Sequence, residues 1–523
     1  MSTRFRVIAT VMIVLTLIAG CGKTDPTATP IPPTESSAYW PTESWRTSTP
    51  EQQGMDSERL AEGLDFLQER REEYNVHSLL IVHNGYVVAD AYFYPFTQDT
   101  KHDLASVTKS FIATLIGIAI DEGYINSVRQ PVLDFFPERT VANVDANKRA
   151  MTVEDLLTMR SGLDCIVRST EVTLFEMVRS PDWVQFTLDL PMSEEPGARF
   201  VYCSSGVHLL SAIIQQASGM SALDFAQKHL FDPLGISDVA WPSVQGINFG
   251  WGDLRITPHA MAKLGYLYLH EGLWEGQQVL SPEWVAAATS VPEGASFGGN
   301  YGYLWWLSSG FYSARGRGGQ MIYVVPDQDM VVVFTGGGGG REDEVTQELL
   351  TSYIIPAAES ETILPASPDG AALLASKIQQ AAAPAQAEPE PVMPLPEMAQ
   401  RVSGQTYLLE GSSFGMRWFS LTFQEQQDEA LFKWIFYGTG DQGIEYRVGL
   451  DGVPRISEGR FGIPAAVKGS WESDNVFVIH LDEVGNTNKW RIRLNFDGER
   501  VSVQMQEVAT GLASETFGGQ LER

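Results

Sequence analysis

Hydrophobic positions switch between helical and strand spacing across residues 50–356. Periodicity and capping residues predict helices at 57–73, 106–120, 152–159, 207–218, 221–230 and from Thr257-Pro258 onward. β-rich runs predict strands at 78–82, 86–92, 303–307, 320–325 and 330–334. Ser57 and Thr152 are the expected N-caps of their helices, Thr152 together with Asp155 in a capping box. Helices inserted between early and late strands predict an α+β domain, an antiparallel sheet flanked by helices plus a helical subdomain.

The pattern becomes all-β towards the C-terminus. Residues 357–397 are rich in Ala and Pro and predict a linker with one helix at 369–382. Within 398–523, strands are expected at 417–423, 431–437, 446–450, 476–481, 490–496 and 501–506. Roughly eight strands at this spacing predict a small barrel or sandwich, most simply a lipocalin-like barrel. It carries no catalytic cluster, so we expect a structural or substrate-gating role.

The N-terminus has the pattern of a secretion signal. Arg4 and Arg6 precede an apolar run, Val7–Ala19, that is shorter than the ~20 residues of a membrane-spanning helix. Cys21 directly after Ala-Gly resembles the lipobox of bacterial lipoproteins, in which the cysteine is acylated and residues 1–20 are removed; the alternative is an ordinary signal peptide with a coincidental cysteine. The Thr- and Pro-rich residues 21–50 are then expected as a flexible tether. The resemblance implies an extracytoplasmic protein held by lipid on a bacterial cell membrane.

The chain is strongly acidic and poor in cysteine. Its formal net charge is −29, and loss of residues 1–20, which hold two arginines and no acidic residue, would make it −31. Such a surface repels phosphate polymers, so a nucleic-acid partner is not expected. If Cys21 carries lipid, Cys165 and Cys203 remain, and outside the cytosol they can form a disulfide or stay as two buried thiols.

The clearest chemical signal is Ser106-Val107-Thr108-Lys109, just ahead of the apolar run Phe111–Ile120. A serine and a lysine at this spacing share one face of a helix. Burial against apolar side chains lowers the pKa of a lysine, so that its amine can take the proton of the serine hydroxyl. The spacing therefore indicates a nucleophile with its base.

Two later segments offer the other parts of an acyl-transfer site. Tyr202-Cys203-Ser204 precedes an apolar helix, and a tyrosine near two cations can have its pKa lowered and act as general base or acid. Arg317-Gly318-Gly319-Gln320 precedes the predicted strand 320–325. Glycines there let a substrate approach the backbone, so that the N–H groups of Gln320 and Ser106 can face an oxyanion. Taken alone, these segments could equally be a packed aromatic residue and a Gly-rich hairpin.

These three segments, in this order, resemble the motifs of serine β-lactamases and penicillin-binding proteins. The closer likeness is to class C β-lactamases and to the related family VIII-type esterases and 6-aminohexanoate-dimer hydrolases. The sequence around these motifs shares the resemblance at residues 156–163, 233–236, 301–306 and 318–320. The resemblance covers about residues 50–356 and implies a β-lactamase/transpeptidase-like fold.

The resemblance also implies roles. Ser106 would be the acylated nucleophile, Lys109 the base or proton shuttle, and Tyr202 would assist acylation and activate the deacylating water. The N–H groups of Ser106 and Gln320 would form the oxyanion hole. Substrate contacts are expected from Ser204, Arg317, Gly318 and Gly319, and an aromatic segment near the cleft, or simply core, from Tyr301, Trp305 and Trp306. No cofactor and no metal are implied.

The second and third motifs depart from the β-lactamase pattern. Ser204 stands where many β-lactamases have Asn, which removes an amide contact. Arg317-Gly318-Gly319 stands where Lys-Thr-Gly or a His variant is usual, so the positive charge is kept and the hydroxyl is lost. Both departures favour an ester or amide over a β-lactam. Short acyl esters, peptide-like amides and D-amino-acid peptides all fit a hydrolase working through an acyl-enzyme.

Three other classes compete with this interpretation. A Ser-His-Asp hydrolase lacks support because the eight histidines have no motif context comparable to that of Ser106 and Lys109. A metal site would have to use His77 and His83, which lie at the early hairpin without a His-x-x-x-His partner. A catalytically inactive surface binding protein would suit the tether and barrel, but the intact Ser106, Lys109 and Tyr202 favour an enzyme.

Overall fold

The computed structural model describes residues 39–168, 171–292, 300–358, 360, 362–384, 388–412, 415–423, 428–436, 442–509 and 514–523. The expected signal peptide, Cys21 and most of the expected tether lie outside these residues and stay predictions. Over the described ranges, no helix combines the length and the apolar character needed to cross a membrane.

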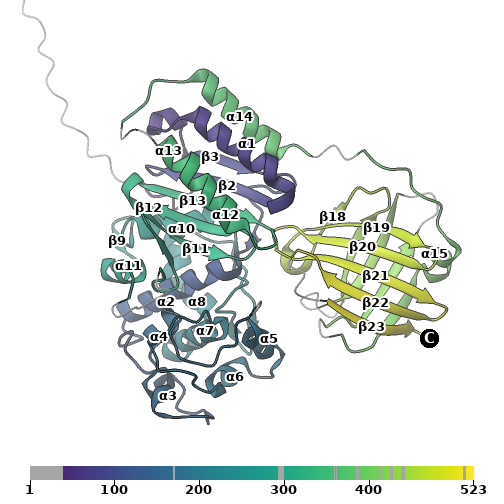
Figure 1. The fold of residues 1–523 in the computed structure, drawn as a ribbon, viewed down its shortest axis with the longest axis horizontal. Coiled ribbons are helices and arrows are strands. Elements are labelled where there is room, and N and C mark those ends of the chain that lie inside the picture. Colours follow the sequence, from purple (N-terminus) through teal and green to yellow (C-terminus); the bar gives the residue numbers. More distant parts are fainter. Residues whose placement is uncertain are drawn as a thin grey trace, which may run out of the picture. The chain divides into compact units, whose positions relative to one another are not determined.

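The core of the first domain is a seven-stranded sheet in the described part of the chain (Figure 1). Its strands, in spatial order, are β1 (Arg46–Thr47), β3 (Tyr86–Tyr92), β2 (Val76–His83), β13 (Met330–Gly336), β12 (Gln320–Val325), β11 (Phe311–Gly316) and β10 (Trp306–Ser308). β1 runs parallel to β3, and every other neighbouring pair is antiparallel. The predicted antiparallel sheet is therefore confirmed, with the pair from the early hairpin beside strands from the end of the domain.

Helices cover both faces of this sheet, because successive strand residues point to opposite sides. In β13, Val332 and Phe334 pack in a core with helices α1 (Ser57–Tyr74), α12 (Glu342–Leu349) and α14 (Pro368–Ala382). Val331 and Val333 pack in a separate core with α2 (Thr108–Asp121), α7 (Ser204–Ser218) and α10 (Pro258–Leu269). Figure 1 shows these two helix layers on either side of the strands.

Shorter elements complete the domain. The predicted helical subdomain is built of α3 (Ala146–Ala150), α4 (Val153–Leu157), α5 (Val172–Arg179), α6 (Trp183–Asp189) and α8 (Ala222–Ala226) around α7. Further short helices and strands are α9 (Asp232–Leu234), α11 (Pro282–Ala288), α13 (Ile355–Ala357), β4 (His102–Asp103), β5 (Ser243–Val244), β6 (Ile247–Asn248), β7 (Arg255–Ile256), β8 (Leu273–Trp274) and β9 (Gln277–Gln278). β4 pairs with β7 directly ahead of Ser106, so the chain enters the site on a fixed strand.

The helix caps are partly as expected. Thr152 and Asp155 form the predicted capping box of α4, and Thr257 caps α10 by accepting the N–H of Ala260. The prediction for Ser57 is wrong, because Asp56 caps α1 by accepting the N–H groups of Glu58 and Arg59. Ser57 is the first helical residue, and its hydroxyl instead donates to Glu51.

The folded domain extends beyond the expected limits of 51 and 356. Residues 40–50 were expected to end a flexible tether, but β1 pairs with β3 and the indole of Trp45 donates to the carbonyl of His259 at 3.2 Å. The helix expected at 369–382 exists as α14, yet it is no mere linker element. Its Leu374 and Ala381 are buried in the core that contains α1.

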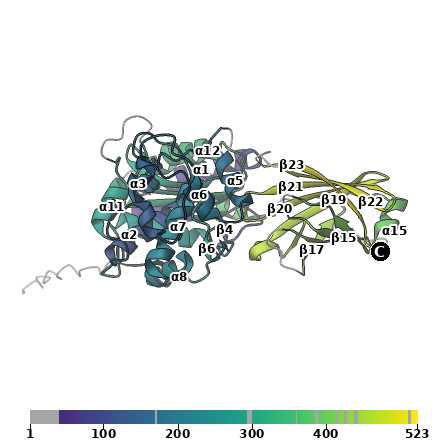
Figure 2. The same cartoon turned by 90° about the horizontal axis from the view of Figure 1, so that it is seen from below.

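The C-terminal domain is a closed β barrel, so the alternative of a sandwich is excluded. Its strands are β14 (Gln405–Leu409), β15 (Trp418–Phe423), β16 (Glu429–Ile435), β17 (Ile444–Gly449), β18 (Arg455–Ser457), β19 (Ala465–Ser473), β20 (Val476–Glu483), β21 (Lys489–Asp497), β22 (Arg500–Glu507) and β23 (Ser514–Leu521), preceded by α15 (Glu397–Val402). Pairing of β17 with β19 closes nine of these ten described strands into a ring, and β18 adds to β19. Figure 2 shows the strands curving around one interior, which buried side chains such as Phe419, Phe432 and Trp434 fill.

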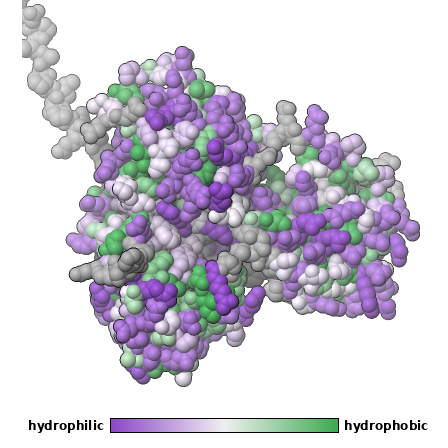
Figure 3. Space-filling view, in the orientation of Figure 1, coloured by the Kyte–Doolittle hydropathy of each residue, from purple (hydrophilic) through white to green (hydrophobic). Residues whose placement is uncertain are grey.

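The visible surface is mainly polar. The face seen in Figure 3 is mainly hydrophilic, with hydrophobic residues scattered among polar ones. Among described residues, the most exposed large hydrophobic side chains are Met393, Ile363 and Val291, which lie far apart in the sequence. Single exposed apolar side chains of this kind are normal on a globular surface.

Candidate active site

Ser106 lies in a single tight turn, Ala105–Val107, between β4 and α2. Ala105 has a left-handed backbone with φ of 45°, which is uncommon for a residue with a Cβ. The carboxylate of Asp103 accepts the N–H of Ala105 at 2.9 Å and so fixes this turn. Ser106 is thereby held half-buried at the start of α2.

Lys109 follows one turn later and is almost fully buried, with 1% of its surface exposed. Its Nζ donates to Ser106 Oγ at 2.7 Å and to the carbonyl of Trp251 at 2.9 Å. Burial lowers the pKa of Lys109 from 10.5 to about 8, and the carboxylate of Glu171 opposes this shift. The structure therefore brings serine and lysine together in the geometry that their spacing predicted.

Tyr202 completes a cluster around Ser106. Its hydroxyl is hydrogen-bonded to Ser106, and Lys109 Nζ lies 5.0 Å from its ring centre. The expectation that cations lower the pKa of Tyr202 is wrong. Burial, and after it the negative charge of Glu171, raise that pKa well above its ordinary value. Tyr202 is thus a neutral phenol at physiological pH, a hydrogen-bond donor rather than a phenolate base.

The aromatic segment 301–306 divides between site and core. Trp306 stacks on Tyr202 with ring centres 6.2 Å apart, and Tyr301 meets Trp306 edge-on at 4.7 Å. Trp305 is fully buried and packs against Tyr268 at 4.6 Å. Trp306 and Tyr301 therefore fix the position of Tyr202, whereas Trp305 belongs to the core.

Glu171 is a functional candidate that the sequence did not reveal. Its carboxylate accepts the N–H and the hydroxyl of Ser204, each at 2.9 Å. The hydroxyl of Ser204, expected to contact substrate, is therefore already engaged as a donor. Glu171 stands alone in the sequence with no motif around it, and only the folded chain brings it beside the second motif.

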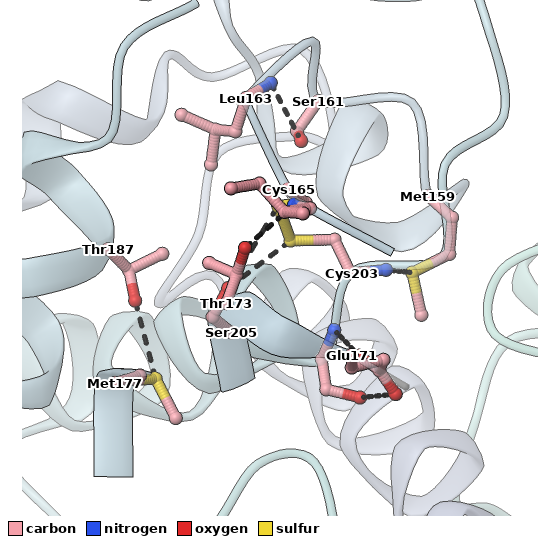
Figure 4. Close-up of a disulfide and its surroundings, with 12 residues drawn as sticks. Met159, Ser161, Leu163, Cys165, Glu171, Thr173, Met177, Thr187, Cys203 and Ser205 are labelled. Carbon is pink, nitrogen blue, oxygen red and sulfur yellow. Dashed lines mark hydrogen bonds between the residues drawn. A yellow bond between two sulfur atoms is a disulfide. The ribbon is translucent and has the colours of Figure 1, made fainter. Parts of the chain in front are cut away.

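A disulfide joins Cys165 to Cys203, next to Tyr202 in the sequence (Figure 4). The hydroxyl of Ser205 lies 3.3 Å from the Cys203 sulfur. Figure 4 also shows Glu171 reaching the start of α7 from a separate segment of the chain. The bridge ties the loop before α5 to the residue that leads into α7.

The expected oxyanion-hole residues lie on either side of Gly316. An ideal Cβ on Gly316 would be 3.2 Å from the backbone nitrogen of Ser106 and 3.1 Å from Cβ of Gln320. Gly316 also pairs with Gln320 across β11 and β12. The Gln320 side chain is buried and donates to the carbonyl of Gly336. The fold thus brings the two predicted backbone donors into one neighbourhood.

The remaining residues of the third motif adjoin the barrel. Arg317 is exposed, and its guanidinium donates to the side-chain oxygen of Asn488 at 3.3 Å. Gly318 and Gly319 are buried, with φ of 87° and 92°. The loop between β20 and β21 therefore lies directly against this motif, a contact that the sequence did not predict.

A pair of carboxyl groups supports the nucleophile turn. Asp253 is hydrogen-bonded to Asp103, and burial together with the Asp103 carboxylate raises the pKa of Asp253. Asp253 itself has a left-handed backbone with φ of 64°. Since Asp103 holds the N–H of Ala105, the pair couples the loop at 251–254 to Ser106.

The histidines considered for a metal site are packed core residues. His77 is buried, stacks on Phe96 at 3.7 Å between ring centres and contacts the amide of Asn75 at 3.2 Å. His83 is buried at the hairpin. Across the described residues, no group of three potential His, Cys, Asp or Glu ligands is assembled.

The helix-flanked antiparallel sheet and the cluster at the start of α2 are those of the β-lactamase/transpeptidase class. The family model for beta-lactamases matches residues 65–350, and the chain belongs to this family, whose members are serine hydrolases. The 6-aminohexanoate-dimer hydrolase of Paenarthrobacter ureafaciens is 26% identical over 311 residues, covering 54% of this chain and 78% of that protein. A beta-lactamase of Escherichia coli K12 is 28% identical over 186 residues, covering 33% of this chain and 45% of that protein.

Solved structures show the same fold. A Bacillus anthracis structure assigned as a 6-aminohexanoate-dimer hydrolase superimposes with a TM-score of 0.51 at 19% identity. The match covers 63% of this chain and 91% of that one. At this identity the likeness concerns the fold, and the chemistry of this chain rests on its own residues.

Proposed function

We propose that this protein hydrolyses an ester or amide bond through an acyl-enzyme formed on Ser106. The observation that carries the proposal is the contact of 2.7 Å between Lys109 Nζ and Ser106 Oγ, with the lysine buried and its pKa lowered to about 8. A buried amine at this position can take up a proton near neutral pH, which a solvent-exposed lysine cannot. An inactive binding protein would have no need of such a pair.

Acylation begins with the neutral amine of Lys109. Ser106 Oγ attacks the substrate carbonyl carbon while its proton passes to Lys109, and the carbonyl electrons move onto oxygen. The N–H groups of Ser106 and Gln320 stabilise this oxyanion. Collapse of the intermediate breaks the bond to the leaving alcohol or amine. The leaving group receives a proton from the Tyr202 phenol, which regains one from Lys109.

Deacylation reverses the proton path. A water attacks the ester carbonyl of acyl-Ser106 and gives its proton to the neutral Lys109 amine. The bond between Ser106 Oγ and the acyl carbon then breaks, and Ser106 recovers its proton as the carboxylic acid departs. Because Tyr202 is a neutral phenol in the resting enzyme, it donates a proton to the leaving group in acylation and a hydrogen bond in deacylation.

Ester and amide substrates are favoured over β-lactams. The second motif lacks the Asn amide, and the hydroxyl of Ser204 is held by Glu171. The third motif has no hydroxyl of its own at Gly318. The relationship to a 6-aminohexanoate-dimer hydrolase, whose name specifies the dimer of an amino acid rather than a β-lactam, supports the same choice.

The test of the proposal is covalent labelling of Ser106. Wild-type protein is assayed with p-nitrophenyl esters, with nitrocefin and with linear amides, and a fluorophosphonate probe is located by peptide mass spectrometry. We expect turnover of at least one ester, a label on Ser106, and loss of both in Ser106→Ala. Ser502→Ala, an exposed serine on β22, is the matched control. An unlabelled and inert wild type would overturn the proposal.

Lys109 is tested by its effect on acylation. Lys109→Met keeps the length of the side chain and removes the base, so the acylation burst should fall roughly 10²–10⁴-fold. Lys468→Met, an exposed lysine on β19, should leave the burst unchanged. An unchanged burst in Lys109→Met would place the base elsewhere.

A further inference from the structure

The loop between β20 and β21 approaches the nucleophile side of the site. The carbonyl of Gly485 accepts the N–H of Asp103 at 2.8 Å, three residues ahead of Ser106. An ideal Cβ on Gly485 would lie 2.5 Å from the carbonyl oxygen of Lys101, and its φ is 89°. Only glycine permits so close an approach. The loop between β20 and β21 therefore packs directly against β4, the strand that leads into Ser106.

The tip of the same loop lies on the third motif. An ideal Cβ on Gly318 would be 2.3 Å from Thr487 Cγ2 and 3.2 Å from Thr487 Cβ. The methyl group of Thr487 thus fills the space that a side chain at position 318 would take. In the Lys-Thr-Gly pattern of the family, this central position carries the hydroxyl that Gly318 lacks.

The hydroxyl of Thr487 is buried without a partner. Thr487 has no exposed surface, and within the described part of the chain its Oγ1 makes no hydrogen bond. A buried hydroxyl in this state costs free energy unless another molecule supplies its partner. The next residue, Asn488, accepts a hydrogen bond from the Arg317 guanidinium at 3.3 Å, so the loop also contacts the positive charge of the third motif.

Hydrogen bonds hold the backbone of the loop around Thr487. The side-chain oxygen of Asn486 accepts the N–H of Thr487 at 2.6 Å and the amide of Asn488 at 3.1 Å. Where the loop begins, at the end of β20, the buried Glu483 carboxylate accepts two hydrogen bonds from the Arg460 guanidinium, at 2.5 and 2.8 Å. These contacts fix the backbone that carries the Thr487 side chain.

From this geometry we propose that Thr487, a residue of the barrel, supplies the substrate-binding hydroxyl of the third motif. It donates a hydrogen bond to an oxygen acceptor that the substrate carries beside the scissile carbonyl, a second amide carbonyl or a carboxylate. The inference rests on the proposed acyl-transfer function and narrows its substrate class to acyl donors that bear such an oxygen. It also gives the barrel a direct part in specificity.

The experiment compares two activated esters with the same leaving group. p-Nitrophenyl N-acetylglycinate carries an additional carbonyl, and p-nitrophenyl butyrate does not. Thr487→Val keeps the shape of the side chain and removes the hydroxyl. We expect the ratio of kcat/KM for the acetylglycinate to kcat/KM for the butyrate to fall about tenfold, and Thr487→Ser to restore it. Thr516→Val, an exposed threonine on β23, is the matched control.

The outcomes separate this inference from the proposed function. A wild type that hydrolyses both esters while Thr487→Val keeps their ratio would overturn the role of Thr487 and leave the acyl-enzyme standing. An equal loss of kcat/KM for both esters would mean that Thr487 acts only by packing, which would also overturn its proposed role as a hydrogen-bond donor. A wild type inert towards both esters and unlabelled at Ser106 would overturn the proposed function itself. Thr487→Ala provides the same comparison if Thr487→Val does not fold.

Discussion

Glu171 accepts two hydrogen bonds from Ser204, one from the backbone N–H and one from the hydroxyl, each at 2.9 Å. The same carboxylate acts on both groups that flank the nucleophile. Burial lowers the pKa of Lys109, and the negative charge of Glu171 opposes that shift. Burial raises the pKa of Tyr202, and the charge of Glu171 raises it further. One acid outside the three motifs thus influences the protonation of Lys109 and Tyr202 together.

Glu171→Gln should shift the pH dependence of hydrolysis towards lower pH. The active form of Lys109 is the neutral amine, so kcat/KM should rise with pH around the lysine pKa of about 8. Removing the negative charge removes the one influence that raises this pKa, so the rising limb moves to lower pH. The glutamine amide can still bind Ser204, because its oxygen accepts the backbone N–H and its NH2 group donates to the hydroxyl, which can rotate to accept. The measurement is the pH profile of kcat/KM with a p-nitrophenyl ester.

Glu176→Gln, an exposed residue on α5, is the control and should leave the profile unchanged. A rising limb that stays in place in Glu171→Gln would mean that Lys109 is not the titrating base or that Glu171 does not act on it.

Loss of the disulfide should destabilise the domain and disturb the site. The bridge closes a loop with a sequence separation of 38 residues, for which chain entropy predicts about 4 kcal/mol of stability. The double variant Cys165→Ser/Cys203→Ser should unfold at lower urea concentration and should also lose activity, because Cys203 adjoins Tyr202. Dithiothreitol should bring the wild type to the same midpoint and leave the variant unaffected. Equal midpoints of wild type and variant without reductant would contradict the prediction.

The parts of the site that local spacing encodes could be predicted from the sequence. Ser106 and Lys109 share a helix face because they are one turn apart, and Thr152 and Asp155 form their capping box for the same reason. β12 agrees with its apolar run, residue for residue. β11 was missed because Ala314, Arg315 and Gly316 give little strand signal, and pairing with β12 decides the conformation there.

The rest of the site depends on tertiary contacts that no local pattern carries. Glu171 and Thr487 lie in segments without a recognisable motif. Each reaches the site only because the fold packs a distant segment of the chain against it. The pKa of Tyr202 was predicted in the wrong direction because burial, and after it the charge of Glu171, outweigh the hydrogen bond with Ser106 that lowers it. The sequence likewise placed residues 40–50 outside the domain, since a two-residue strand such as β1 is recognisable only once its partner is known.

Asp253→Asn should remove a pH-dependent loss of stability. Burial and the Asp103 carboxylate raise the pKa of Asp253, so the folded protein keeps a proton that the unfolded chain releases above about pH 4. Stability conferred by such a group falls as pH rises towards the raised pKa. The midpoint of urea unfolding of Asp253→Asn, relative to the wild type, should therefore increase from pH 5 to pH 8. Asp497→Asn, at the exposed last residue of β21, is the control; a difference independent of pH would contradict the assignment.

The ion pair of Arg460 and Glu483 should make the barrel loop sensitive to single substitutions and tolerant of a double one. Both side chains are nearly buried, at 6% and 5% exposure, with Nε to Oε1 at 2.5 Å. Glu483→Leu leaves an unpaired buried guanidinium and should cost about 3–5 kcal/mol, whereas Arg460→Met/Glu483→Leu removes both charges and should recover most of that loss. The measurement is a double-mutant cycle from urea unfolding, run with the ester ratio that reports on Thr487. The backbone N–H of Asn486 donates to the carbonyl of Glu483 at 2.9 Å, so Glu483→Leu should also change the ratio of kcat/KM between the two esters. A double variant as unstable as Glu483→Leu would show that packing, and not charge pairing, dominates here.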